Sequence, residues 1–368
     1  MRHPVLGLVV MVAAASLLML PLSAHHEITA KFDPAKTTRL QGIVTLVDWA
    51  NPHVHIFMNV GTGNNIVNWA IELESVIDLQ RAGYKRDTLK PGDSVSVEGI
   101  LARDGSRQVW GNTVTAAGKR VFNVPDDAPS RAAAGPTPRW PDGKPRLGPT
   151  TGTTGYWARP SMTILAENGT NIRANKNGLL ANIADVDKVA PFQRWARDLF
   201  ELRQRNRLAD DPQYLYCLPP GGPRQYQEAY GVQFVEDKEH QRVFVFVGGV
   251  DHNWRLIYLD GRQQRGQDRG DADNPLYYGR AVGKWEGDSL VVDVKGFDEK
   301  FWMSNGGLPH TEKLHLIERF TRTDANTLKY EVTIDDTGAY TRSWSSGWNL
   351  QWMPNEELPA FFCQDNRP

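Results

Sequence analysis

The sequence lacks the charge and composition typical of several large classes of protein. Its 42 Lys and Arg residues nearly match its 43 Asp and Glu residues, so a net charge of −1 supplies no broad positive field for a nucleic-acid backbone. We therefore expect no nucleic-acid partner. A hydrophobic content of 40% and a charged content of 23% over 368 residues exclude a disordered tail protein, a collagen and a polytopic membrane protein. This composition is instead sufficient for more than one packed domain.

Several enzyme motifs are also absent from the sequence. It contains no glycine-rich phosphate loop after a strand, no nucleophile elbow, no Cys-x-x-Cys pair and no His-Glu-x-x-His helix. These absences argue against nucleotide-dependent enzymes, ordinary serine hydrolases and zinc peptidases.

Residues 1–24 have the features of a cleaved secretory signal peptide. Arg2 precedes an apolar run over residues 5–20 that is short for a membrane span, and residues 21–24 place a helix breaker and a small residue before the cleavage site. Cleavage makes His25 the mature N-terminus, and no cysteine follows to carry a lipid. We expect a periplasmic or secreted protein without stable membrane insertion. An uncleaved single-span anchor is the alternative.

Cysteine is scarce, and only Cys217 and Cys363 are present. Two thiols in an oxidising compartment tend to pair, so we predict one disulfide that ties the C-terminal tail to the entrance of the second domain. Two buried free cysteines are the alternative. A catalytic role for Cys217 is not expected, because no base or cation lies closer in the sequence than Arg224.

Short β-branched segments separated by turns follow the cleavage site. The predicted strands are 39–48, 53–60, 65–73, 94–102 and 108–116. A helix is predicted at 75–82, between the third and fourth strands. Three strands, a helix and two strands form the order of an OB-fold barrel, which we assign to residues 25–123. A fragment of a β-sandwich is the alternative.

Residues 124–160 are rich in Pro, Gly, Ala and Thr. Such a composition cannot bury a core and predicts an extended linker between two domains. Trp140 and Trp157 within the segment indicate that parts of it dock on a neighbouring surface.

Residues 161–368 form the second predicted domain. A helix is expected at 191–208, with one apolar face packed on a sheet and formed by Phe192, Trp195, Leu199 and Leu202. The predicted strands are 242–247, 254–259, 280–285, 290–294, 313–321 and 327–335. Tight turns between sequential antiparallel strands favour a lipocalin-like β-barrel or a sandwich.

Two sets of motifs resemble families of uncharacterised secreted bacterial proteins. The first, from a family of small proteins, is Ala24-His25-His26, Trp49-Ala50-Asn51-Pro52-His53 and Lys90-Pro91-Gly92-Asp93. The second is Cys217-Leu218-Pro219-Pro220-Gly221-Gly222-Pro223-Arg224, Tyr258-Leu259-Asp260-Gly261-Arg262 and Gly283-Lys284-Trp285-Glu286-Gly287-Asp288. Together the resemblances cover most of the mature chain. They imply a compartment and a domain layout, and they imply no activity.

Four histidines of the N-terminal domain are candidate metal ligands. His25 and His26 open the mature chain, and His53 and His55 lie two apart on a predicted strand, which places both on one face. An N-terminal histidine can bind Cu(II) through its imidazole and its α-amine, with a third nitrogen from His53 or His55. The alternative is an exposed N-terminus, with His53 fixing an Asn-Pro turn.

Strand alternation predicts a carboxylate inside the second domain. Glu318 shares a face with Leu314, Leu316 and Phe320, whereas His315 falls on the opposite face. Burial raises the pKa of a carboxyl group unless a cation neutralises it, so Glu318 is a candidate for acid/base catalysis. A buried ion pair with Arg255 that holds the barrel together is the alternative.

Histidines and aromatic residues near predicted loops are further candidates. His310 follows a glycine-rich segment, His252 lies just before Trp254, and loops at the mouth of a barrel commonly contact ligands. Trp254 and Trp302 are among 12 tryptophans, whose rings suit an aromatic, terpenoid or sugar ligand or simply a β-protein core. The predicted ligand contacts are His252, Trp254, Arg255, Tyr258 and Trp302.

We therefore predict a mostly β, secreted or periplasmic protein whose barrel binds a small apolar or aromatic molecule without a required cofactor. If the barrel also catalyses a cofactor-independent isomerase or lyase reaction, Glu318 and His310 are the predicted catalytic residues. The alternatives are a periplasmic copper-binding protein that uses His25 and a structural envelope protein. Neither the identity of the ligand nor the oligomeric state is predicted.

Overall fold

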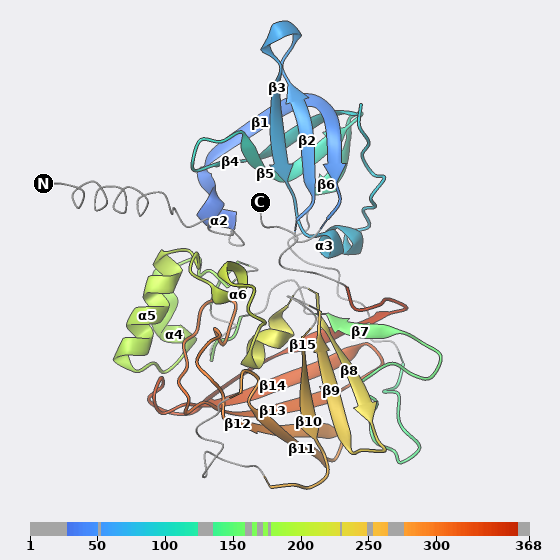
Figure 1. Ribbon diagram of the computed structural model, residues 1–368, viewed down its shortest axis with the longest axis vertical. Helices are drawn as coiled ribbons and strands as arrows, with labels where there is room; N and C mark the ends of the chain where they lie inside the picture. The colour runs from blue at the N-terminus through green and yellow to red at the C-terminus, as the bar shows by residue number, and fades with distance from the viewer. Residues whose placement is uncertain are drawn as a thin grey trace, which may run out of the picture.

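The computed structural model describes residues 28–50, 53–123, 135–158, 164–167, 172–175, 178–228, 230–248, 253–263 and 276–359. These residues form a mostly β protein, and its two β-domains lie one above the other in Figure 1. The predicted fold class is confirmed. In the described part of the chain, no helix has both the length and the hydrophobicity needed to cross a membrane.

The N-terminal domain has its elements in the chain order expected for an OB-fold. They are α2 (Ile28–Lys31), β1 (Phe32–Asp48), β2 (His55–Val60), η1 (Gly63–Asn65), β3 (Val67–Glu72), α3 (Val76–Arg81), β4 (Ser94–Ala102), β5 (Gln108–Ala116) and β6 (Lys119–Asn123). The strands are ordered β3-β2-β1-β4-β5, and a parallel pairing of β3 with β5 closes the circle. The domain is therefore an OB-like barrel, which β6 extends beyond β5.

β1 belongs to both halves of this barrel. It pairs with β4 in its first part and with β2 in its second part, and Gly42 and Ile43 take part in both pairings. A Cβ atom at Gly42 would lie 2.2 Å from the carbonyl oxygen of Asn59. Only glycine permits so close an approach of two backbones, so Gly42 allows the strand to bend around the barrel.

α3 connects the core of the first domain to the second domain. The Ser75 hydroxyl caps the helix by accepting a hydrogen bond from the backbone N–H of Asp78 at 3.1 Å. Leu79 is buried in the OB-like core, whereas Ile77 packs against Tyr230 of the C-terminal domain. The short helix thus contributes one apolar side chain to each domain.

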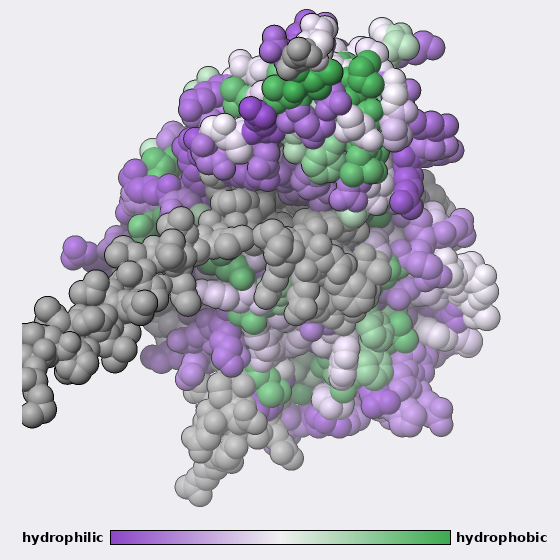
Figure 2. Space-filling model, turned by 45° about the horizontal axis from the view of Figure 1, so that its top comes forward, coloured by the Kyte–Doolittle hydropathy of each residue, from purple (hydrophilic) through white to green (hydrophobic). Residues whose placement is uncertain are grey.

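The surface of the N-terminal domain carries apolar side chains. Figure 2 shows them gathered at the end of the molecule where this domain lies. Its exposed large apolar residues include Ile43, Leu46 and Ile66. Much of the length of β1 is also solvent-exposed, so this domain presents an accessible sheet surface outside its core.

The C-terminal domain is a closed barrel in the described part of the chain. Its strands are β7 (Gly155–Ala158), β8 (Val232–Asp237), β9 (Arg242–Val247), β10 (Asn253–Tyr258), β11 (Arg280–Glu286), β12 (Ser289–Lys295), β13 (His315–Arg322), β14 (Thr327–Asp335) and β15 (Trp344–Pro354). Strands cannot alternate in direction all the way around a closed ring of nine. One pair is accordingly parallel, β10 with β11, and the other pairs are antiparallel.

Residues 135–158 belong to the segment predicted to be an extended linker. They instead pack on the barrel and contribute its strand β7. Glu236 of β8 accepts hydrogen bonds from Trp140 Nε1 and from the backbone N–H of Leu147, both at 2.9 Å. Leu147 is fully buried, and its carbonyl oxygen accepts Trp157 Nε1 at 2.7 Å. The docking predicted from Trp140 and Trp157 is therefore confirmed, whereas the extended linker predicted from the Pro- and Gly-rich composition was wrong for these residues.

Helices cover one side of the barrel (Figure 1). They are η3 (Ile183–Asp185), α4 (Val186–Val189), α5 (Arg194–Arg205), α6 (Pro212–Leu215) and η4 (Gly222–Gln227). α5 confirms the predicted helix, but its buried residues are Ala196, Phe200 and Gln204. Trp195 is 45% exposed and Leu202 61% exposed, so the predicted apolar face was wrong at these two residues, whereas Phe192 packs against the core as predicted. The buried Gln204 amide satisfies three backbone groups of nearby loops, which explains how a polar residue occupies the inner face.

Candidate functional site

A charged pair lies buried inside the barrel. Leu316, Glu318 and Phe320 of β13 are fully buried, as strand alternation predicts. Arg255 Nη2 donates to Glu318 Oε2 at 2.5 Å. The Tyr330 hydroxyl, on the neighbouring strand β14, donates to Glu318 Oε1 at 3.0 Å. The predicted ion pair between Glu318 and Arg255 is therefore present, and each carboxylate oxygen has a partner.

Burial and charge set the protonation of this cluster. Burial lowers the pKa of Arg255, but the adjacent Glu318 carboxylate raises it more, and the net pKa lies above its usual value. Burial raises the pKa of Tyr330 well above its usual range, and the negative charge of Glu318 raises it further. At neutral pH the barrel therefore holds a permanent cation beside a neutral phenol.

Tyr226 of η4 adds a second phenol to the interior. Its ring centroid lies 4.5 Å from that of Tyr330 and 5.2 Å from that of Phe320. The Trp348 indole donates to the Tyr226 carbonyl oxygen at 3.0 Å. Burial raises the pKa of the Tyr226 hydroxyl, so this group is also protonated at neutral pH. η4 thus places a neutral phenol against the aromatic side chains around the ion pair.

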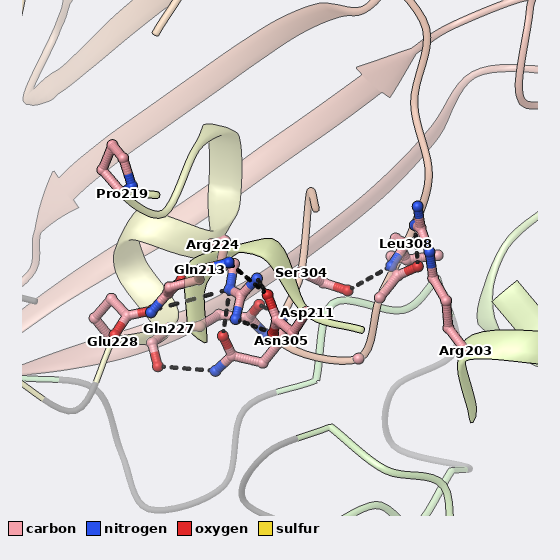
Figure 3. Close-up of polar contacts among 12 residues, drawn as sticks. Arg203, Asp211, Gln213, Pro219, Arg224, Gln227, Glu228, Ser304, Asn305 and Leu308 are labelled. Carbon is pink, nitrogen blue, oxygen red and sulfur yellow. Dashed lines mark hydrogen bonds and ion pairs between the residues drawn. The ribbon is translucent and has the colours of Figure 1, made fainter. Parts of the chain in front are cut away.

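Arg224 anchors η4 through a buried polar network (Figure 3). Its guanidinium donates to both carboxylate oxygens of Asp211, at 2.8 and 2.6 Å, and to Asn305 Oδ1 at 2.9 Å. Glu228 lies 4.0 Å from Arg224 Nε. All three guanidinium nitrogens have partners, and the side chain is 1% exposed. We therefore assign Arg224 to positioning η4, and with it Tyr226.

His310 has a separate environment from this cluster. The centroid of its buried ring lies 4.1 Å from that of the Phe301 ring, which is tilted by 32° to it, and its Nε2 lies 3.0 Å from the Phe301 carbonyl oxygen. Its Nδ1 lies 3.3 Å from the carbonyl oxygen of Thr311, and burial lowers its pKa. Among the contacts of the described residues, none joins His310 to Glu318. The imidazole is thus 6% exposed, and its neighbours are the Phe301 ring and two backbone carbonyl groups.

The predicted ligand contacts on β10 lie on opposite faces of the strand. Arg255 is buried inside the barrel, whereas Trp254 is 50% exposed and Tyr258 occupies the same outer face. Trp254 packs against Phe244 with ring centroids 5.6 Å apart, and the Arg262 guanidinium lies 3.5 Å from the Tyr258 ring. Grouping Trp254 and Tyr258 with Arg255 was therefore wrong, because residues of opposite parity cannot share a face.

The other predicted site residues lie apart from the barrel cluster or outside the described residues. Trp302 is buried against the Arg203 guanidinium, which lies 4.5 Å from its ring. His252 lies outside the described residues. Cys217 adopts a positive φ of 55°, and its predicted partner Cys363 also lies outside the described residues, so the disulfide stays a prediction.

In the N-terminal domain, His53 and His55 meet at one buried carboxylate. Glu72 on β3 lies opposite His55 on β2. Its carboxylate lies 2.5 Å from His53 Nδ1 and 3.6 Å from His55 Nε2, and it accepts Lys31 Nζ at 2.7 Å. Sequence reasoning missed Glu72, because only the register of β2 against β3 brings it to the histidines. The two imidazoles lie at the same carboxylate, although β2 begins at His55 and His53 precedes it, so the predicted strand over 53–60 was too long at its start.

The charge of Glu72 is stabilised despite its burial. Burial raises the pKa of this carboxyl group, but hydrogen bonds with the two histidines and the nearby lysine lower it more, to well below its usual value. Among the described residues, no group of three His, Cys, Asp or Glu side chains is arranged to hold a metal ion. The other predicted ligands, His25 and His26, lie outside the described residues.

Comparisons with known proteins concern the N-terminal part of the chain. A family of unknown function, DUF6152, matches residues 12–111, which include β1 to β4 and part of β5. No curated protein matches the chain. The function of the matching family is unknown, so the function of this chain has to be argued from the geometry of the sites.

Proposed function

We propose that the chain is an exported protein, periplasmic or secreted, whose C-terminal barrel binds a small, largely apolar or aromatic molecule. The Arg255–Glu318 ion pair, surrounded by the rings of Tyr226, Phe320 and Tyr330, carries the proposal. Small-molecule sites are typically apolar and aromatic, with a few convergent polar groups that orient the ligand. A ring of nine strands also encloses a wider interior than the eight-stranded barrels that hold one small ligand.

The energetics of the ion pair support a role beyond stability. Taking two charges out of water costs several kcal/mol per ion, and apolar residues of similar volume often stabilise a fold equally well or better. Arg255 and Glu318 are both almost fully buried in an otherwise apolar core. Ligand recognition gives a reason for charged residues at these positions that stability alone does not.

The proposal is limited to binding and includes no isomerase or lyase reaction. A general base must reach the proton that it removes from the substrate. Both oxygens of Glu318 are engaged, one by Arg255 and one by Tyr330. His310 contacts backbone carbonyl groups and Phe301. The two predicted catalytic residues thus have separate partners.

The test uses the mature full-length chain and N-phenyl-1-naphthylamine, a neutral aromatic probe that fluoresces in apolar sites. We expect saturable binding and a higher Tm, because a ligand that binds only the folded state stabilises it. Replacing the inner pair, with Arg255→Met and Glu318→Leu together, should tighten binding of this apolar probe, because the variant removes both buried charges and the two Arg255 nitrogens that lack an acceptor.

The matched control removes an ion pair on the outer face of the barrel. Arg319 follows Glu318 on β13, and its Nη2 donates to Glu286 on β11 at 2.7 Å. The double variant Arg319→Met and Glu286→Gln should bind the probe as the wild type does. If the probe does not bind, or binds equally to all three proteins, the barrel site is refuted and a structural envelope protein becomes the better hypothesis.

Copper binding is a second candidate function, and the N-terminal domain supports it. Ile28 packs in one cluster with Trp110, whose ring centroid lies 5.3 Å from that of His53. His25 precedes Ile28 by three residues, which span at most about 10 Å when extended. We propose that, after cleavage, His25 binds Cu(II) through its imidazole and α-amine together with His53 or His55.

Copper titration of exported protein tests this candidate. Intact mass establishes that the chain begins at His25, and a variant with one additional residue before His25 should lose tight Cu(II) binding. The double variant His53→Ala and His55→Ala should also bind more weakly. His240, which pairs with Asp237 on the barrel surface, provides the control His240→Ala. Equal affinity in the processed and extended forms would exclude this site.

A further inference from the structure

The barrel cluster contains hydrogen-bond donors that have no acceptor. In the described part of the chain, Arg255 Nε, Arg255 Nη1 and the Tyr226 hydroxyl are buried without a hydrogen-bond partner. Arg255 uses only Nη2, in its bond to Glu318. Arg224, which is equally buried, donates from all three of its nitrogens. Arg255 therefore differs from an arginine whose bonding capacity is used by the fold.

The three unpartnered donors all belong to the cluster of side chains inside the C-terminal barrel. Tyr226 packs on Tyr330, Tyr330 donates to Glu318, and Glu318 binds Arg255. Buried donors without a partner are uncommon in folded proteins, because each forfeits its hydrogen bonds to water. Three such donors in one aromatic interior indicate that an acceptor from outside the chain binds there.

We infer that the barrel ligand is a neutral apolar or aromatic molecule with an acceptor oxygen, such as the carbonyl group of a ketone, ester or amide. The inference rests on the proposed function, because it assumes that the barrel binds a small molecule. The acceptor oxygen takes hydrogen bonds from Arg255 and Tyr226, and the body of the ligand packs on Tyr330 and Phe320. A ligand without an acceptor would leave these donors unpartnered.

The charge of the cluster decides between a neutral and an anionic ligand. Arg255 is already neutralised by Glu318, with their charged atoms 2.5 Å apart in a fully buried environment. A carboxylate or sulfonate ligand would add a negative charge that no second cation of the cluster offsets. Burying an uncompensated charge is far more costly than burying a carbonyl group. A neutral acceptor satisfies the donors without this cost.

Three naphthalene derivatives of similar shape test the inference on the mature full-length chain. 2-Acetylnaphthalene carries a neutral acceptor, 2-ethylnaphthalene carries none, and 2-naphthoate carries an anionic one. Their affinities are measured by displacement of N-phenyl-1-naphthylamine. We expect 2-acetylnaphthalene to bind about ten-fold more tightly than 2-ethylnaphthalene, as one hydrogen bond from a charged donor provides. We expect 2-naphthoate to bind more weakly than 2-acetylnaphthalene.

Variants assign the preference to the named donors. The double variant Arg255→Met and Glu318→Leu should reduce the difference between the acetyl and ethyl compounds to the part that the tyrosine hydroxyls of the cluster provide, without leaving a buried charge unpaired. Tyr226→Phe should reduce the difference by about two- to five-fold, because it removes one neutral donor. Tyr340→Phe is the matched control, since the buried Tyr340 hydroxyl donates to the Pro309 carbonyl oxygen at 2.7 Å. It should preserve the preference.

The possible failures are distinguishable. Equal affinities for the acetyl and ethyl compounds would overturn the inference and leave the barrel as an apolar binding site. Tightest binding of 2-naphthoate would also overturn it, because the ligand class would then be anionic. Failure of N-phenyl-1-naphthylamine and all three compounds to bind would refute the proposed function itself.

Discussion

The two domains hold their buried carboxylates in different ways. The Glu72 carboxylate of the OB-like domain contacts a lysine and two histidines, whose side chains remain 15–30% exposed. Glu318 of the barrel has an arginine and a tyrosine as partners, and all of these side chains are almost fully buried. The partners of Glu72 are therefore partly accessible to solvent, whereas the ion pair of Glu318 places permanent charges inside an apolar barrel.

Breaking the inner pair should give the largest effect on stability. Glu318→Leu leaves Arg255 charged and unpaired in the barrel, which should lower the free energy of unfolding by about 3–5 kcal/mol. Adding Arg255→Met should recover most of the lost free energy of unfolding, because no buried charge then lacks a counter-ion. Urea unfolding at pH 7 measures both variants. A single variant as stable as the double variant would show that the barrel interior tolerates an isolated cation.

The pH dependence of stability tests the role of the Glu72 charge. The pKa of Glu72 is lower in the folded chain than its ordinary value of 4.5, so its stabilising contribution is complete above that value and is lost as the pH falls below it. The variant Glu72→Gln should be less stable than the wild type at pH 7 and should lack this part of the acid sensitivity. Urea unfolding at pH 7, 5 and 4 tests this.

Glu98→Gln is the control for Glu72, since Glu98 lies on β4 of the same domain and is more than half exposed beside Arg39. It should follow the wild type at every pH. If Glu72→Gln retains the full loss of stability below pH 4.5, the acid sensitivity arises elsewhere in the molecule.

Two buried tyrosines of the C-terminal domain should respond differently to loss of the hydroxyl group. Tyr340→Phe removes the hydrogen bond to the Pro309 carbonyl oxygen and should cost about 1 kcal/mol. Tyr226→Phe removes a hydroxyl without a partner among the described residues and should leave stability unchanged or raise it. Urea unfolding without ligand compares the two. An equal loss in both variants would show that the Tyr226 hydroxyl is already bonded.

The smallest effect is expected at the outer face of the barrel. Arg319 and Glu286 form an ion pair in contact with solvent, where water screens the attraction. Removing both charges, with Arg319→Met and Glu286→Gln, should leave the Tm within experimental error of the wild type. A clear decrease would mean that charge on this barrel is structurally important on either face.

Local sequence patterns predicted many of the strands. β4, β5, β9 and β14 have the predicted bounds, because alternating burial and flanking turns are local properties. β7 was missed because its four residues lie in a Pro- and Gly-rich segment and become a strand only by pairing with β15 and β8. The buried face of α5 was also mistaken, because Gln204 finds its hydrogen-bond partners only in loops distant in the sequence.

For the candidate sites too, local patterns predicted some features and only the packed structure showed the others. Alternation placed Glu318 inside the barrel, yet the same rule separates Trp254 and Tyr258 from Arg255. Tyr226 could not be found, because η4 has no periodicity that marks a residue as part of a barrel interior. The unpartnered donors that define the inferred ligand are likewise a property of the packed molecule.

The amino-acid sequence by itself determined the mostly β class, the order of many strands and the inward direction of Glu318, because side-chain alternation and turn residues act over a few positions. Only the tertiary structure decided that Glu72 meets two histidines and that Tyr226 packs on Tyr330. These residues are distant in the chain, and their meeting depends on strand register, barrel closure and the anchoring of η4, which no short segment specifies.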